Sequence, residues 1–523
     1  MATPAFTYSP PSITVVTNGP LNVLQAAAPL KTILMLGTAP QGPDFPTLCS
    51  AQDALNLFGN PGSYTSLGYD LPLALRLASI QRQPTAGTGV QFLVCRVGVT
   101  RASQIIAASA GTGTTIAGIG QYAGSSGNNL AINVVITGGA ITSVTIYDVT
   151  TVSAPVIKQQ FIAGANANLS SIQQMANTIN GANPLRNPNS IVQITAVGTG
   201  ALTSTVVGST NSVSIGGGMY GQQLISGTDG LGANSSDGTI APLLAASLWA
   251  FADYIYAGFD YSAIAPTILT HIQSALLQNQ FRKAVLGPKS GVTYGTLTSG
   301  TYVSGNTSDR IVCIGHDSVY TVSPITGNPT IVDGFYAAAA FAGLKAAGPT
   351  QETCTKFAIG GFTGVVTPTD LVASTNGLTQ AQLNLLAGSG LLVFEQTLAD
   401  GALRIRDSIT TAPYAFTGGS GGVNGGINVF SQFSARDIDD AWSNAMVQAL
   451  TPMLGRVFPS QSILQQAFTL ACTSAAAALG NTIGGYSISV QLSPTTNQPT
   501  VVGNYTMPFP VLNITIPTAF TIA

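Results

Sequence analysis

Apolar runs in the first hundred residues predict alternating strands and helices. Nearly continuous apolar runs at Thr32–Leu36 and Val90–Val97 are typical of strands buried on both faces. Between them, Ser50–Phe58 opens on a serine followed three residues later by an aspartate, which predicts a capped helix. Leu71–Ile80 predicts a second helix. This part of the chain is therefore expected to be α/β.

The middle of the chain, residues 101–235, changes to Gly, Ala, Ser, Thr, Val and Ile with few charges. Apolar and polar positions alternate in Leu130–Ile136 and Ile141–Tyr147, and Ile191–Val197 resembles them. One helix is predicted near residues 169–179. We expect a mostly β domain inserted between two α/β segments.

The α/β pattern returns after residue 240. Helices are predicted near residues 242–257 and 262–279, followed by strands at Lys283–Leu286 and Arg310–Gly315. Later elements are a helix at Asp333–Ala347, a helix at Thr379–Ala387, and strands at Gly390–Glu395 and Leu403–Ile409. Strands alternating with helices favour a mixed sheet covered by helices. The predicted fold class is α+β, with several domains.

The last hundred residues predict a helix pair and short strands. Ser434 is expected to cap a helix whose apolar face includes Ile438 and Trp442, and Pro452 should kink it. A second helix is predicted at 462–479, and a strand at Tyr486–Val490. Short β-branched runs near the two chain ends predict extended arms there.

Composition narrows the possible functions. The chain has 523 residues, enough for about three or four domains. Only 7% of its residues are charged, and 17 Lys and Arg are too few for a large nucleic-acid footprint. A hydrophobic fraction of 45% excludes a disordered chain, and five cysteines do not suggest a disulfide framework. A weakly charged surface favours association with other copies.

The chain offers little chemistry for catalysis. It has two histidines, and Cys313, His316 and Asp317 form the one compact group of ligand types, which we expect to be packing rather than metal binding. The glycine patterns at residues 118–123 and 418–422 lack the strand and helix context of a dinucleotide site or a nucleophile elbow. The apolar run Ala241–Phe259 carries Asp253 and no basic flanks, so we expect a buried helix. We predict no enzyme activity, no cofactor and no metal site.

Several motifs in order resemble the sheath proteins of contractile phage tails and related injection machines. The opening Ser9–Val15 and the segment from Lys31 to Gly59 are similar to the start of that family. Gly120–Asn128 resembles the turn that opens its inserted β domain, and Leu224–Gly230 the loop that closes it. The remaining motifs are Ala337–Gly348, Leu386–Phe394 and Arg406–Thr411, which look like its core helix, late strand and Thr-Thr signature.

The resemblance implies a structural subunit that polymerises helically around an inner tail tube and contracts to drive the tube through a host cell envelope. The energy would be stored in metastable subunit packing. Implied partners are other copies of the chain, the inner tail tube protein, and baseplate and tail terminator proteins, without nucleic acid or direct membrane insertion. The implied location is the virion tail, assembled in the host cytoplasm.

The expected domain scheme has five parts. They are an N-terminal arm (1–25), a discontinuous α/β domain (26–100 with 236–412), an inserted outer β-rich domain (101–235), a C-terminal inner domain (413–505) and a C-terminal arm (506–523).

Two groups of residues are the candidate sites. The two arms would exchange strands between subunits through Ser12, Ile13, Thr14, Val15 and Val16 at one end and Val511, Leu512, Asn513, Ile514, Thr515 and Ile516 at the other. The charged face of the late helix would meet the tube through Arg436, Asp437, Asp439, Asp440 and Arg456. For the three aspartates we favour charge complementing a helix N-terminus over a cation site.

A second class of protein stays open. A β-rich virion decoration or adhesion protein that binds a surface ligand would account for the Gly- and Thr-rich residues 101–235. The flanking α/β segments and the late helices favour the interpretation as a tail sheath protein.

Overall fold

The structure of the chain is a computed structural model. It describes residues 31–61, 68–81, 90–108, 115–120, 124–137, 140–164, 172–180, 191–197, 204–205, 212–216, 219–299, 301–371, 378–396, 402–412, 432–453, 456–492 and 499–505. The predicted exchange strands, residues 12–16 and 511–516, lie outside the described residues. Mixed helices and several sheets confirm the expected α+β class.

Two compact units make up the chain. The first consists of Met1–Leu34, Ala74–Leu93 and Leu248–Ala523, and the second of Met35–Leu73 and Val94–Ser247. The boundary between the units falls within secondary-structure elements, at residues 34/35, 73/74 and 93/94. The five-part domain scheme stays a prediction.

A six-stranded sheet has the order β17-β16-β15-β1-β3-β2. Its strands are β1 (Thr32–Gly37), β2 (Thr47–Ser50), β3 (Gln91–Arg96), β15 (Tyr254–Asp260), β16 (Lys283–Gly287) and β17 (Ile311–Cys313). β15, β16 and β17 are parallel neighbours, with Tyr254 opposite Lys283 and Ala284 opposite Ile311. β1 and β16 are buried throughout, which explains their continuous apolar sequences.

The helix predicted near residues 242–257 is wrong for its second half. The chain forms α4 (Ile240–Ala246) and a 3-10 turn (Ser247–Trp249), and then enters β15. A run that is apolar at every position carries no period that separates a buried helix from a buried strand. The aromatic and β-branched residues Tyr254, Ile255 and Tyr256 favour the strand. Within the described residues, no helix has both the length and the apolar character needed to cross a membrane.

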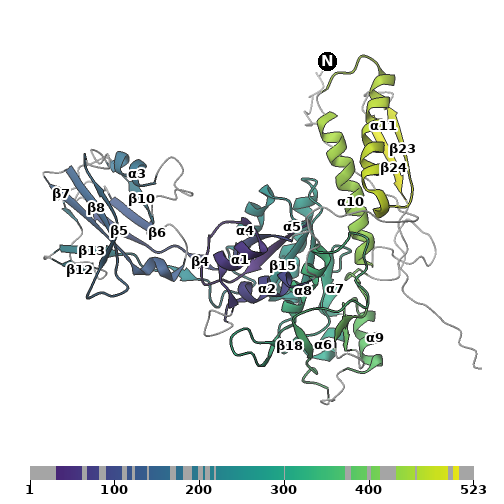
Figure 1. Ribbon diagram of the computed structural model, residues 1–523, viewed down its shortest axis with the longest axis horizontal. Helices are drawn as coiled ribbons and strands as arrows, with labels where there is room; N and C mark the ends of the chain where they lie inside the picture. Colours follow the sequence, from purple (N-terminus) through teal and green to yellow (C-terminus); the bar gives the residue numbers. More distant parts are fainter. Residues whose placement is uncertain are drawn as a thin grey trace, which may run out of the picture. The chain divides into compact units, whose positions relative to one another are not determined.

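Helix α8 (Gly334–Ala346) is the most deeply buried helix element of the first unit. All 13 of its residues are buried, and it packs against β15 and β16 (Figure 1). Gly343 permits a close approach of α8 to Ala78, because a Cβ added there would lie 2.2 Å from the carbonyl oxygen of Ala78. Helix α5 (Tyr261–Leu276) also packs on these strands, and its N-cap Asp260 accepts a hydrogen bond from the Ser262 amide.

Smaller elements complete the α/β part of the first unit. They are α6 (Tyr294–Thr298), α7 (Thr301–Ser304), β18 (Ser318–Val322), β19 (Pro329–Asp333), β20 (Phe362–Val365), α9 (Gln380–Gly388), β21 (Phe394–Gln396) and β22 (Leu403–Ile405). β21 and β22 pair antiparallel, so the two predicted late strands exist but are shorter than expected. Thr379 caps α9 through a capping box with Gln382.

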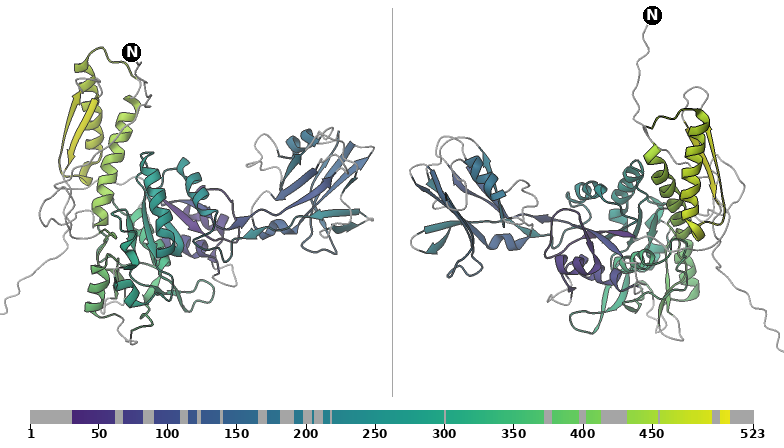
Figure 2. Two further views of the ribbon diagram at one scale, coloured as in Figure 1. Left: turned by 180° about the vertical axis from the view of Figure 1, so that it is seen from behind. Right: turned by 45° about the horizontal axis from the view of Figure 1, so that its top comes forward.

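The C-terminal part of the first unit is a helix pair with a β-hairpin. Helix α10 (Phe433–Leu450) and α11 (Gln461–Ala478) lie side by side, and the antiparallel hairpin of β23 (Tyr486–Leu492) and β24 (Pro499–Tyr505) packs on them (Figures 1 and 2). Their common core includes Trp442, whose ring stacks on Tyr505 at 4.9 Å between centroids. The predicted cap is wrong: α10 begins at Phe433, so Ser434 lies inside it. α10 ends before Pro452 instead of being kinked by it.

The second unit contains two antiparallel sheets. One has the order β10-β6-β5-β11 and the other β12-β13-β7-β8-β9. Their strands are β5 (Ser103–Ala108), β6 (Thr115–Gly120), β7 (Leu130–Thr137), β8 (Ala140–Asp148), β9 (Val156–Ile162), β10 (Val192–Val197), β11 (Ser204–Thr205), β12 (Ser212–Gly216) and β13 (Met219–Gln223). Helix α3 (Ile172–Asn180) packs beside β10, and its Met175 and Ile179 join the apolar core. The alternating pattern of β7 and β8 therefore predicted these strands correctly.

The two ends of this β-rich segment are joined by specific contacts. β4 (Val99–Thr100) pairs with β14 (Thr228–Asp229). The side chain of Asn128 donates to the Gly227 carbonyl and accepts from the Gly227 amide, both at 2.9 Å. A Cβ at Gly227 would lie 2.4 Å from the carbonyl oxygen of Gly124, so glycine is required there. We call the two hydrogen bonds between Asn128 and Gly227 the Asn128 clamp.

Elsewhere in the second unit, α1 (Ala51–Phe58) begins as predicted. The Ser50 side chain accepts a hydrogen bond from the Asp53 amide, which satisfies one of the free donors at the helix start. The predicted second helix is α2 (Asp70–Ser79), whose last six residues belong to the first unit.

Candidate functional site

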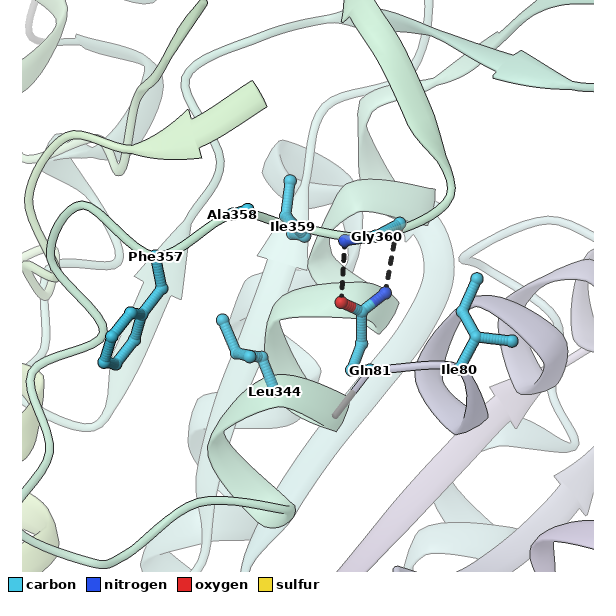
Figure 3. Close-up of a pocket in the computed structure, with 7 residues that line it drawn as sticks. All are labelled: Ile80, Gln81, Leu344, Phe357, Ala358, Ile359 and Gly360. Atoms are coloured by element: carbon cyan, nitrogen blue, oxygen red, sulfur yellow. Dashed lines mark hydrogen bonds between the residues drawn. The ribbon is translucent and has the colours of Figure 1, made fainter. Parts of the chain in front are cut away.

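A small pocket lies at the end of α8 and is lined by residues of three segments (Figure 3). Its volume is about 290 Å³, and its walls are Ile80, Gln81, Leu344 and Phe357–Gly360. The Gln81 amide is already occupied: it donates to the Gly360 carbonyl and accepts from the Gly360 amide, both at 2.9 Å. The pocket therefore presents apolar surface and no group suited to acid–base or nucleophilic chemistry.

The His316 and Cys313 side chains are packed rather than exposed. His316 Nε2 accepts a hydrogen bond of 2.8 Å from the Phe394 amide, and its ring stacks on that of Phe394. Burial lowers the pKa of His316 to about 4, so the ring is neutral at pH 7. Burial also raises the pKa of the Cys313 thiol. Across the described part of the chain, no group of three or more His, Cys, Asp and Glu side chains is arranged to hold a metal ion.

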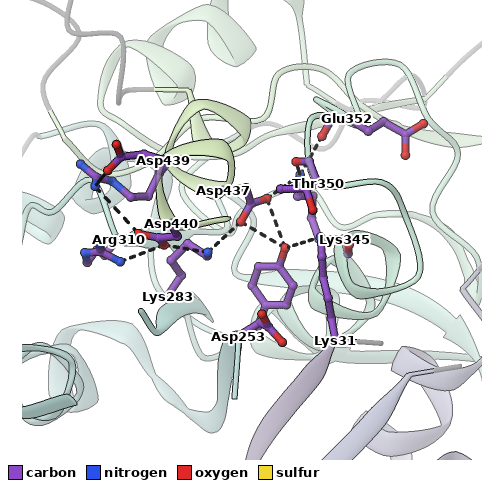
Figure 4. A network of polar contacts seen from close by, with 12 residues as sticks. Lys31, Asp253, Lys283, Arg310, Lys345, Thr350, Glu352, Asp437, Asp439 and Asp440 are labelled. Carbon is purple, nitrogen blue, oxygen red and sulfur yellow. Dashed lines mark hydrogen bonds and ion pairs between the residues drawn. The ribbon is translucent and has the colours of Figure 1, made fainter. Parts of the chain in front are cut away.

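The main concentration of charge is a buried group at the start of α10 (Figure 4). We call it the charged network. It contains five cations and five carboxylates, ten of the chain's 36 charged side chains. Its members are Lys31, Lys283, Arg310, Lys345, Arg436, Asp253, Asp309, Asp437, Asp439 and Asp440.

Asp437 is the centre of the charged network. Its carboxylate lies 2.7 Å from Lys345 Nζ and 3.0 Å from Lys283 Nζ, and it accepts a hydrogen bond from the Tyr254 hydroxyl at 3.1 Å. Burial by itself would raise the pKa of Asp437. The ammonium groups of Lys345 and Lys283, and that of Lys31, instead hold this pKa well below its usual range.

Asp440 forms the second focus, one helical turn further along α10. The Arg310 guanidinium binds both of its oxygens, at 2.6 and 2.9 Å, and Lys283 Nζ lies 2.8 Å away. Burial opposes ionisation of Asp440, but Arg310 and Lys283 keep its pKa lowered. Lys283 thus bridges the two aspartates, and their charges raise its pKa against the effect of burial.

Arg436 and Asp439 extend the charged network towards the hairpin. Arg436 pairs with Asp439 at 2.6 Å and with Asp309. The Tyr505 hydroxyl of β24 donates to Asp439 at 2.5 Å. Burial, together with the Asp439 charge, raises the pKa of Tyr505, so this hydroxyl stays protonated as a donor.

Lys31 is the weakly compensated cation. Its Nζ contacts the Tyr254 hydroxyl at 3.3 Å and the Lys345 carbonyl at 3.5 Å, although only 6% of the residue is exposed. Burial lowers the pKa of Lys31 to about 8, even though Asp437 favours the charged form. Asp253 is similarly placed: burial raises its pKa, and it accepts a hydrogen bond from the Thr32 amide.

Three of the five cations lie at the amino ends of sheet strands, whereas Lys345 belongs to α8 and Arg436 to α10. Lys31 directly precedes β1, Lys283 begins β16, and Arg310 directly precedes β17. Ligand sites of open parallel sheets normally lie at the opposite, carboxyl end. The charged network therefore anchors α10 on the sheet. Phe433 supports the anchor because its ring packs against Tyr254 and Phe341.

The predicted charged face of α10 differs from what the structure contains. Arg436, Asp437, Asp439 and Asp440 are each at most 9% exposed and are paired inside the chain, so they form no solvent-facing charged surface. The aspartates neutralise Lys and Arg side chains rather than the helix N-terminus. Arg456 lies beyond α10 and is exposed, and its contact with a tube stays a prediction.

The sequence alone identified Arg436 and three of the five carboxylates of the charged network, Asp437, Asp439 and Asp440, but not their distant partners. Asp440 is 157 residues from Lys283 and 130 from Arg310. One signal was available: four charges in the five positions 436–440 are unusual in a chain with 7% charged residues. Single charges directly before apolar strands, as at Lys31 and Arg310, were the matching signal.

In fold, the chain is similar to the sheath tail proteins. A sheath tail protein of Listeria innocua aligns with 92% of this chain and 96% of its own, with a TM-score of 0.53 and 15% identity. One from Desulfitobacterium hafniense covers 94% of this chain and 100% of its own, with a TM-score of 0.49 and 15% identity. The contracted helical sheath of the anti-feeding prophage covers 99% of both chains, with a TM-score of 0.48 and 12% identity.

The Listeria protein establishes a common fold, and the predicted resemblance to tail sheath proteins is confirmed at that level. No protein-family model matches the sequence, and no curated protein matches it either.

Replacing Lys31 with methionine is expected to stabilise the fold by about 1–4 kcal/mol at pH 7, because it removes a poorly compensated buried charge. The folded pKa of about 8 lies below the ordinary lysine pKa of 10.5, so the cost of the buried charge is fully present below pH 8. As the pH rises from 8 to 10.5, Lys31 of the wild type loses its charge in the folded state, so the difference in the free energy of unfolding between variant and wild type should shrink. Urea unfolding at pH 7 and pH 10 measures this difference. Lys356→Met, at an exposed lysine, is the matched control, and a destabilised Lys31→Met protein would contradict the assignment.

Asp437→Asn is expected to destabilise the protein by about 3–5 kcal/mol, since Lys283 and Lys345 stay buried without their partner. The control Glu395→Gln removes a partly exposed pair with Lys356 and should cost less than about 1 kcal/mol. The folded pKa of Asp437 is depressed, so its contribution is present above the unfolded pKa of about 4. The difference in the free energy of unfolding between wild type and Asp437→Asn should persist from pH 7 to about pH 4 and should disappear only at lower pH. Equal losses for the two variants would show that Asp437 is no anchor.

Proposed function

We propose that this chain is a structural subunit of a contractile tail sheath. Copies polymerise helically around an inner tail tube and contract to drive that tube through a host cell envelope, without catalysis. The observation that carries the proposal is the similarity in fold to the Listeria innocua sheath tail protein over nearly the full length of both chains.

The distribution of charge supports an assembly function. Eight of the 36 charged side chains are buried in the charged network, which leaves the rest of a 523-residue chain sparsely charged. Surfaces with few charges repel one another weakly, so copies associate readily. In the proposed sheath, energy is stored in metastable packing between such surfaces.

The terminal arms are proposed to connect neighbouring subunits. Residues 12–16 and 511–516 would add as strands to the hairpin β23–β24 of another copy. A two-stranded hairpin is marginal by itself, and within the described residues its pairing is limited to its own two strands. Further strands could therefore extend it by backbone hydrogen bonding.

The remaining parts of the proposal follow from a role as a sheath subunit. The segment 101–235 is the outer domain, and the turn after α10 faces the tube protein. Arg456 and Val457, both exposed, are the groups placed for that contact. Baseplate and terminator proteins would bind the two ends of the sheath in the virion tail.

Negative-stain microscopy of the purified chain tests the function directly. Tubes or stacked rings are expected, and discrete monomers or trimers would favour the adhesion or decoration protein instead. Deleting Pro508–Ala523 should leave a soluble monomer with near-native circular dichroism that forms no tubes. Ile514→Pro should act in the same way because proline cannot complete a strand ladder, while Ile514→Val should assemble normally. Normal tubes from the truncated chain would refute strand exchange.

Arg456→Glu is expected to weaken co-assembly with the tube protein at least several-fold, since it reverses a charge on the proposed tube-facing turn. Its stability should stay within about 0.5 kcal/mol of wild type because the side chain is exposed. Lys289→Glu, at an exposed lysine after β16, is the control and should co-assemble normally. Co-sedimentation with the tube protein measures both, and unchanged binding by Arg456→Glu would place the tube contact elsewhere.

A further inference from the structure

Two aromatic side chains of the first unit, just before β15, are exposed to solvent. Trp249 is 60% exposed and Phe251 51%, while Ala250 and Ala252 between and after them are buried. We call Trp249 and Phe251 the aromatic knob. Tryptophan is enriched among the hot spots of protein interfaces.

Two side-chain hydrogen bonds hold the backbone of the aromatic knob in place. The Gln280 side chain donates to the Leu248 carbonyl at 2.6 Å, and the Arg282 guanidinium donates to the Ala250 carbonyl at 2.8 Å. Arg282 is itself fully buried, with His271 Nε2 at 2.9 Å from its Nη1. A surface segment clamped at alternate carbonyls presents its outward side chains with little entropy left to lose on binding.

The surroundings of the aromatic knob determine the kind of partner. Leu248–Ala252 and Tyr261–Phe281 contain no Asp, Glu, Lys or Arg. A partner is therefore recognised by apolar shape rather than by charge. Such a partner needs an uncharged concave surface that can receive a large side chain.

The first unit carries a concave surface of this kind. The pocket beside α8 has apolar walls, its single polar lining side chain, Gln81, is occupied by Gly360, and no charged residue lines it (Figure 3). It is open to solvent, since Ile80 is 48% exposed and Ala358 and Gly360 are exposed. At about 290 Å³ it lies at the lower end of small-molecule sites and suits one or two side chains.

We propose that the aromatic knob of one copy docks into this pocket on the next copy, with Trp249 filling it. The occupant is a second copy of this chain because the chain itself carries both matching halves, apolar and uncharged. The knob and the pocket are different groups of residues, so the contact joins unlike patches. When such a contact repeats in one direction from copy to copy it is heterologous, and it builds open helical assemblies unless it closes as a ring. This interface rests on the proposed sheath function and specifies one of its subunit contacts.

Site-specific photo-crosslinking in the full-length chain tests the pairing. Trp249 is replaced by p-benzoylphenylalanine, and ¹⁴N- and ¹⁵N-labelled chains are mixed, assembled, irradiated and mapped by mass spectrometry. We expect mixed-isotope crosslinks from position 249 to residues 344–360. The same probe at Leu385, which is 58% exposed on α9, is the matched control and should not reach these residues.

Two variants give an independent readout. Trp249→Ala should raise the critical concentration for assembly at least tenfold, because loss of a hot-spot side chain exceeds about 1.4 kcal/mol. Ala358→Trp, which fills the pocket from its own chain, should act similarly. Leu385→Ala should change the critical concentration for assembly less than threefold. Near-native circular dichroism of each variant excludes misfolding.

The outcomes separate the interface from the sheath function. Tubes whose crosslinks from position 249 lie elsewhere, or that assemble normally with Trp249→Ala, overturn the interface and leave the function intact. Crosslinks to residues 344–360 in small oligomers, without tubes, support the interface while the sheath function fails. Absence of both tubes and crosslinks overturns both.

Discussion

The position of α10 depends on one carboxylate, Asp437, which is held between Lys283 at the amino end of β16 and Lys345 on α8. Taking charges out of water is costly, and the cost is offset only when each charge meets close, hydrogen-bonded partners. The five cations and five carboxylates of the charged network balance one another, and the bidentate Arg310–Asp440 pair supplies the geometry. An apolar helix face could slide along the sheet, whereas these pairs fix one register. The buried charges therefore specify where the C-terminal helices sit.

Much of the fold followed from apolar patterning, and the failures have identifiable causes. The strands β1, β3, β7 and β8 and the helices α1, α2 and α8 lie where the sequence predicted them. Residues 254–257 were predicted to be helical because a uniformly apolar run has no readable period. The charged network could not be assembled from sequence, since the pairs of Asp440 with Lys283 and Arg310 join residues more than a hundred positions apart. The acidic cluster was visible, but its burial was not.

The charged network also affects how the first unit transmits force. The start of α10 is tied to the sheet by ion pairs, and its remainder shares one apolar core with α11 and the hairpin β23–β24. In the proposed sheath subunit, a pull on the hairpin by a neighbouring copy would pass through α10 to the strand ends. Tyr505 links the two regions directly, because it belongs to β24 and donates to Asp439.

The Asn128 clamp bears on how this chain could be remodelled. It brings residues 128 and 227 together through two hydrogen bonds, and β4 and β14 pair just outside it. The pair β4–β14 encloses both sheets of the second unit, because β5 and β6 before the clamp pair with β10 and β11 after Asn128. A foreign domain with adjacent termini could therefore be grafted between β4 and β14. Such a graft would turn each copy into a display site and leave the registry of the remaining chain unchanged.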